Sequence, residues 1–169
     1  MGTRGIGAAE RFFLGSTTSS LIADAVCPVV VVPQDFHFAL PKKIGFATDL
    51  KDVVNSTPQK TISAFTEAYG AKLEILHADP DYSEYEPATM EEGLMLDTLF
   101  EQQQPSFHFL HSGYTEESIL KYAAQNNLDL LIIVSKDHGW LNTLFQHQHT
   151  GTFIRQSTIP VLVLKQAHE

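Results

Sequence analysis

The chain has 169 residues, 43% of them hydrophobic, which is enough for one domain with a sizeable core and too few for two full domains. Its formal net charge is −9, so a groove for nucleic acid is not expected, and an anionic ligand would have to be held by backbone amides. The longest apolar stretch, residues 25–33, is far shorter than the roughly 20 residues of a membrane span. A single cysteine, Cys27, cannot form an internal disulfide, which favours a small buried hydrophobe over a reactive thiol and indicates a reducing, cytoplasmic compartment.

The N-terminal residues GTRGIGAAERFFLGST, 2–17, have the glycine and hydroxyl spacing of a phosphate-binding loop. The candidate binding residues are Gly2, Gly5, Gly15, Ser16 and Thr17. Glycines let the backbone approach phosphate oxygens, and Ser16 and Thr17 begin a predicted helix whose free N–H groups attract an anion. A buried strand normally precedes such a loop, and this sequence has no room for one before Gly2.

Short apolar runs alternate with helix-length segments along the rest of the chain. The expected strands are residues 28–33, 43–50, 73–78, 106–111, 129–134 and 160–165. Runs such as LLIIV are apolar at nearly every position, which is typical of parallel strands covered on both faces. The expected helices begin at residues 56–58 and end at Gly70, cover residues 89–104, and begin after a Thr115 cap. This alternation predicts a doubly wound α/β sheet, with ligands beyond the carboxyl ends of its strands.

An internal repeat relates the two ends of the chain. An ungapped offset of 132 residues aligns Phe13 with Phe145, Ile22 with Ile154, Pro28 with Pro160, and Val31 with Val163. The repeated unit is the last helix and last strand of a domain. We therefore expect residues 1–34 to be a remnant of a preceding domain, residues 35–42 a linker, and residues 43–169 a complete domain.

The motif GxxGx9GS, with the trailing CPVVVVP, resembles the closing part of a universal stress protein domain, where the glycine motif wraps the triphosphate of ATP. IGFATDL, LEILHADP, and the stretch from DLLIIVSKDHG to IPVLVL resemble that family's first strand, second strand, and last strand–helix–strand portion. The resemblance implies a five-stranded parallel sheet in order 3-2-1-4-5 with helices on both faces, plus an extra N-terminal helix and edge strand. It also implies that Met1 is an internal methionine of a longer tandem protein, with the missing strand upstream.

The resemblance further implies that Asp49 and His77, at the ends of the first two strands of the complete domain, lie at its nucleotide site. The offset places Val134, Asp137, His147 and Gln148 where the first copy has Gly2, Gly5, Gly15 and Ser16. A carboxylate beside the phosphates, and bulky side chains where the backbone must come close, both disfavour triphosphate. ATP is therefore expected to bind weakly or not at all.

The leading interpretation is a non-enzymatic, cytosolic stress-response module that associates as a homodimer. Its contact would be an antiparallel pair between the residues from Pro28 to Val32 and those from Pro160 to Leu164, in one chain or between two, because a bare apolar edge invites pairing. The alternative is a functional ATP-binding protein whose loop 2–17 is completed by another copy.

A third interpretation is a metal-dependent hydrolase at His147 and His149, since an HxH pair on an extended segment can share a divalent ion. No third ligand is fixed by spacing, so no metal is predicted. No catalytic residue is assigned either, because Glu91 and Glu92 fit the N-terminal part of a helix, where the helix dipole and solvation account for them.

Overall fold

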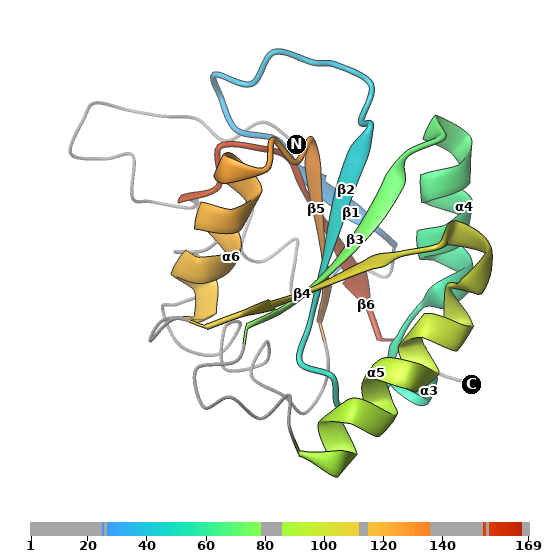
Figure 1. The fold of residues 1–169 in the computed structure, drawn as a ribbon. Coiled ribbons are helices and arrows are strands. Elements are labelled where there is room, and N and C mark those ends of the chain that lie inside the picture. The colour runs from blue at the N-terminus through green and yellow to red at the C-terminus, as the bar shows by residue number, and fades with distance from the viewer. Residues whose placement is uncertain are drawn as a thin grey trace.

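The computed structural model describes residues 25, 27–78, 86–111, 115–135, 154 and 156–166, and Figure 1 shows the arrangement of their elements. The strands are β1 (Val29–Val31), β2 (Lys43–Thr48), β3 (Lys72–Ala78), β4 (Ser106–Leu110), β5 (Leu130–Ser135) and β6 (Val161–Lys165). The helices are α3 (Val53–Ser56), α4 (Gln59–Tyr69), α5 (Pro87–Leu99) and α6 (Thr115–Gln125), with the 3₁₀ turn η2 (Glu101–Gln103) after α5. The helix expected at the N-terminus lies outside the described residues.

All described strands join one sheet in the order β1-β6-β5-β2-β3-β4. Counted from β2, the five parallel strands run 3-2-1-4-5, and β1 is added antiparallel at the β6 edge. The expected α/β class, with a mostly parallel sheet flanked by helices, is confirmed.

The helices cover the sheet on both faces. Helix α6 packs on one face, and α3, α4 and α5 lie on the other (Figure 1). Successive residues of the central strand β5 alternate between the two cores: Leu131 and Ile133 pack in the α6 core, and Leu130, Ile132 and Val134 in the opposite one. Because both faces are covered, both sets of side chains are apolar, and this explains the near-continuous apolar run in the sequence.

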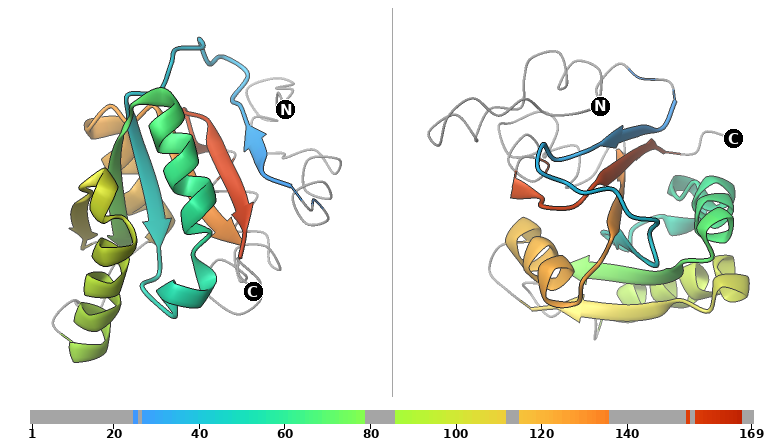
Figure 2. Two further views of the ribbon diagram at one scale, coloured as in Figure 1. Left: turned by 90° about the vertical axis from the view of Figure 1, so that its right-hand side faces the viewer. Right: turned by 90° about the horizontal axis from the view of Figure 1, so that it is seen from above.

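The edge strand β1 pairs with β6 in a register that is centred on two equivalent residues of the repeat. Val30 faces Leu162, its own counterpart in the 132-residue repeat. On either side of this pair, Val29 faces Val163 and Val31 faces Val161, so the pairing has a local twofold relation. Figure 2 shows β1 beside β6 at one end of the sheet. The antiparallel pairing expected from the sequence is therefore made within one chain.

Three helix boundaries differ from the expectation, and one short helix was not expected. Helix α5 begins at Pro87 rather than near residue 89 and ends at Leu99, where a 3₁₀ turn follows. Proline suits the first turn of a helix because it has no N–H to leave unpaired, so the helix starts earlier. A short helix, α3, comes before α4 and was not expected, since four residues are too few for a periodic pattern. Thr115 is the first residue of α6, not a residue before it.

The interpretation of Cys27 as a buried residue is wrong, because the structure exposes it. It comes two residues before β1, and a three-residue edge strand buries less of its flanks than a central strand would. Among the described helices, none combines the length and apolar character that a membrane crossing requires.

Candidate functional site

Asp49 and His77 lie at the carboxyl ends of two neighbouring parallel strands. Thr48, the last residue of β2, is in register with His77 near the end of β3, and Asp49 follows directly. Both polar side chains are largely buried, with 6% of Asp49 and 8% of His77 exposed. The structure thus places both expected site residues of its described part at the sheet edge where ligands of such sheets bind.

The imidazole of His77 is held by its neighbours. Its Nδ1 lies 3.0 Å from the carbonyl oxygen of Thr48, which can only accept, so Nδ1 carries the hydrogen. A neutral ring in this tautomer keeps Nε2 as an acceptor. The ring also packs edge-on against Phe109 of β4, with centroids 5.8 Å apart. His77 therefore ties β3 to the end of β2, and its orientation is fixed on both sides.

The turn after β2 is unusually constrained. Leu50 and Asp52 both adopt left-handed backbone conformations, with φ of 49° and 50°, which is uncommon for residues with side chains. An oxygen of Asp49 accepts a bond from the Lys51 N–H at 3.3 Å, as in an Asx turn, and Thr48 Oγ1 accepts one from the Leu50 N–H at 3.2 Å. The Asp49 carboxylate thus helps to shape the turn that carries it.

Glu92 of α5 holds the far end of this turn. Its two carboxylate oxygens accept bonds from the backbone N–H groups of Asp52, at 3.0 Å, and Val53, at 2.8 Å. These are free donors at the start of α3, whose own N-cap residue, Asp52, makes no side-chain cap bond. The interpretation of Glu92 as a residue serving its own helix missed this role. The partners are about 40 residues away, and nothing in the local pattern indicates them.

A second polar cluster lies beneath α6. Glu74 of β3 accepts a hydrogen bond from the hydroxyl of Tyr122 at 3.0 Å, with Lys43 Nζ at 4.0 Å and His108 Nε2 at 3.8 Å. Burial, then the hydrogen bond to Glu74 and its negative charge, raise the pKa of Tyr122 well above its usual value. Lys43 also donates to the carbonyl of Asn126 at 3.1 Å. These contacts dock the C-terminal half of α6 on the sheet, and no sequence pattern indicates the cluster.

The remaining site predictions fall on other parts of the chain. The glycine loop residues Gly2, Gly5, Gly15, Ser16 and Thr17, the substituted positions Asp137, His147 and Gln148, and the metal candidate His149 all lie outside the described residues. Within the described ranges, no group of three or more His, Cys, Asp or Glu side chains is placed to hold a metal ion.

A cavity of about 300 Å³ lies between α6 and the residues just before β6. Neither Asp49 nor His77 lines it.

Comparisons with known proteins agree with this architecture. The model of the universal stress protein family matches residues 1–33 and 41–165. No curated protein matches the chain. A universal stress protein from Archaeoglobus fulgidus DSM 4304 is 21% identical with a TM-score of 0.66, over 99% of this chain and 60% of its own. The chain therefore spans less than two thirds of that relative's length.

Two shorter structures carry adenine nucleotides. A universal stress protein in complex with cAMP is 17% identical with a TM-score of 0.55, over 75% of this chain and 98% of its own. One from Archaeoglobus fulgidus in complex with dAMP is 12% identical with a TM-score of 0.53, over 76% and 99%. At these identities the likeness concerns the fold, and the family match covers nearly the whole sequence. This chain belongs to the universal stress protein family.

Proposed function

We propose that this chain is a non-enzymatic universal stress protein module that acts by association through the β6 edge of its sheet. In this proposal residues 1–34 are a remnant of a preceding domain, residues 35–42 a linker, and residues 43–169 a complete domain. The module would serve a stress response in the cytoplasm, and its nucleotide site would be degenerate. The observation that carries the proposal is the antiparallel pairing of β1 with β6, in which Val30 faces its equivalent residue Leu162.

The β6 edge is well suited to association. Its residues from Val161 to Leu164 are all buried and apolar, so without β1 they would form an open hydrophobic edge. Val29 and Val31 of β1 are themselves buried against the α6 core. Because Val30 faces its own counterpart, two copies of the same last strand can form the same ladder. A homodimer in which each chain lends its β1 to the other's β6 follows as part of this proposal.

A degenerate nucleotide site is supported by how its described residues are used. The Nδ1 of His77 donates to the Thr48 carbonyl, and the Asp49 carboxylate accepts a hydrogen bond from the Lys51 N–H of its own turn. In sequence, Asp137 and His147 replace the glycines of the phosphate loop, which removes the close backbone approach and adds a negative charge.

Adenine-nucleotide binding is the second candidate. It is favoured by the two neighbours in complex with cAMP and dAMP and by the placement of Asp49 and His77 at the carboxyl ends of adjacent strands. Under this alternative, Gly2, Gly5 and Gly15 would complete a site together with strands of another copy.

Two measurements separate these candidates. Calorimetric titration of the full chain with ATP and magnesium, and with AMP and cAMP, should show no binding tighter than about 1 mM, a free energy of about −4 kcal/mol. Micromolar binding of ATP that Gly15→Val abolishes would contradict the degenerate site and establish the second candidate.

The association role is tested by Val31→Asp, which places a charge on the buried face of β1, with Ala39→Asp in the exposed linker as the matched control. We expect Val31→Asp to release β1, lower the midpoint of unfolding, break the strand-exchanged homodimer and reduce solubility, while the control behaves as wild type. Deletion of residues 1–34 should have the same effect as Val31→Asp. If both changes leave mass, solubility and stability unaltered, β6 is not an association edge.

A further inference from the structure

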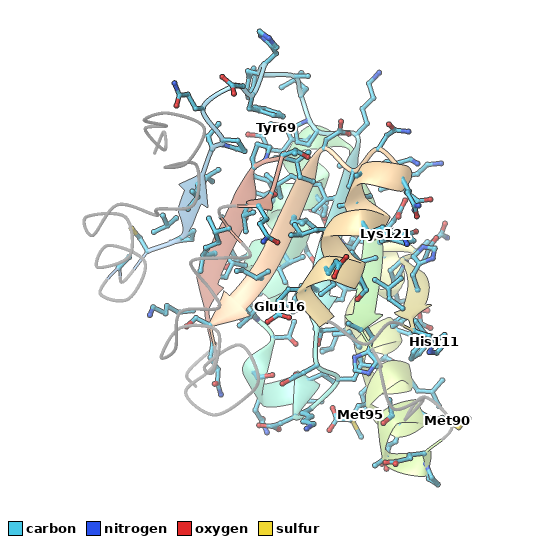
Figure 3. The ribbon with its side chains drawn as sticks, turned by 90° about the vertical axis from the view of Figure 1, so that its left-hand side faces the viewer. Tyr69, Met90, Met95, His111, Glu116 and Lys121 are labelled. Atoms are coloured by element: carbon cyan, nitrogen blue, oxygen red, sulfur yellow. The ribbon has the colours of Figure 1, made fainter. Side chains whose placement is uncertain are left out.

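Helix α5 exposes two large apolar side chains, Met90 and Leu94, on the side that faces away from the sheet. Met90 and Leu94 are 56% and 69% exposed, and Met95 is 38% exposed, while Leu96 and Phe100 on the inner side are fully buried. An ordinary surface helix has only one apolar face, so this second one is not needed to hold α5 on the sheet. Figure 3 shows that Met90 and Met95 project from different sides of this helix.

Two other exposed apolar residues, Met95 and Val54, lie where α5 meets α3. Met95 lies three residues after Glu92, so both project from the same side of the helix, and Glu92 bonds to the start of α3 at Val53. The next residue, Val54, is 55% exposed. Because Met95 and Val54 lie on another side of α5, we name only the ridge of Met90 and Leu94 the methionine patch.

Acidic side chains surround the methionine patch. Glu86, Glu91, Asp97 and Glu101 are exposed along or beside α5, and residues 86–104 contain no lysine, arginine or histidine. Such a rim favours a basic occupant. It disfavours a second copy of this chain, whose own α5 carries the same charges, and the anionic surface of a lipid bilayer.

We propose that the methionine patch docks a basic amphipathic helix of another protein. Met90 and Leu94 are four residues apart and form one ridge along α5, which suits a partner helix with apolar side chains at i, i+3, i+4 and i+7. Methionine side chains are flexible and polarisable, so Met90 can adjust to partners of differing shape. Lysine or arginine at the margins of the partner helix would face Glu91 and Asp97.

The test uses a labelled synthetic peptide of about 18 residues, long enough to form a helix, made of leucine and lysine in the i, i+3, i+4, i+7 pattern. A matched peptide carries glutamate in place of lysine. Fluorescence anisotropy with the full-length protein should show binding of the lysine peptide only. The affinity should fall as NaCl is raised from about 0.05 M to about 0.5 M, because the rim charges are screened.

Protein variants identify the surface. The double variant Met90→Ser, Leu94→Ser should weaken peptide binding about tenfold or more, because both side chains would be buried on docking. Phe38→Ser, at an exposed apolar residue of the linker, is the matched control and should bind as wild type. In ¹³C-methyl methionine spectra, the Met90 signal should shift on titration more than the Met95 signal, and the Met1 signal should not shift.

Three results would overturn the proposal. The first is no binding of the lysine peptide, or equal binding of the glutamate peptide. The second is unchanged affinity in the double variant while circular dichroism shows it folded. The third is evidence for another occupant. If the double variant has a lower mass in solution than wild type, the occupant is a second copy. If wild type binds phosphatidylserine vesicles and the double variant does not, the occupant is a bilayer.

Discussion

Removing the carboxylate of Glu92 should loosen the turn that carries Asp49. In Glu92→Ala, the N–H groups of Asp52 and Val53 lose acceptors at 3.0 and 2.8 Å. A hydrogen bond to a charged group contributes about 1.5–3 kcal/mol net. The bond to Asp52 is exposed, so water can replace its acceptor, whereas the bond to Val53 is partly buried. We therefore expect a loss of about 2 kcal/mol in the free energy of unfolding, close to the value of one such bond.

Urea unfolding measures this loss, and hydrogen exchange locates it at the amides of Asp52 and Val53. Glu91→Ala is the matched control, since Glu91 is an adjacent exposed carboxylate and surface substitutions of this kind stay within about 0.5 kcal/mol. The reasoning is refuted if Glu92→Ala is as stable as Glu91→Ala, or if exchange at Asp52 and Val53 is no faster than in wild type.

The other predictions concern the core and the cluster beneath α6. In Gly45→Ala, the new Cβ would lie 2.6 Å from Cδ1 of Leu128 and 2.9 Å from Cδ2 of Leu131, so unfolding experiments should show a loss of about 1–3 kcal/mol. Gly93→Ala, whose Cβ would meet nothing within 4 Å, should instead gain about 0.5–1 kcal/mol, and a loss there would contradict the open surroundings of Gly93. The raised pKa of Tyr122 keeps its phenol protonated in the folded state at a pH where the unfolded chain, with the ordinary tyrosine pKa of 10.0, already ionises. The contribution of Tyr122 is therefore complete below about pH 10 and declines above it, by at most about 1.4 kcal/mol per pH unit. The stability difference between wild type and Tyr122→Phe should shrink as urea titrations move from about pH 9 to about pH 11, and a constant difference would exclude this coupling.

The sheet could be predicted from the sequence because its strands are apolar on both faces, and such runs are distinctive whatever lies beside them. The repeat made it possible to predict the edge strand β1, which is less obvious. Alone, residues 28–33 could belong to any buried strand, but their match to residues 160–165 predicts that they are the same strand of another copy. The exposed Cys27 shows where this reasoning fails, since burial beside an edge strand depends on what covers the edge.

The candidate site could be predicted only in part. That Asp49 and His77 lie at the same edge of the sheet follows from parallel strands ending there. That His77 donates to Thr48, and that Glu92 caps α3, depend on register and on helix placement across tens of residues. Local periodicity holds no information about either. The same limit applies to the cluster around Glu74, whose members come from three strands and a helix.

The two proposed surfaces lie on different parts of one sheet. Strand β1 covers the β6 edge, whereas α5 connects β3 to β4, and β4 is the opposite edge. A helix docked on the methionine patch would therefore leave the β6 edge untouched, and strand exchange at β6 would leave α5 exposed. Sites with no shared contacts contribute additively. Each surface can thus be lost without the other, and a chain using both would join a second copy at β6 to a different partner at α5.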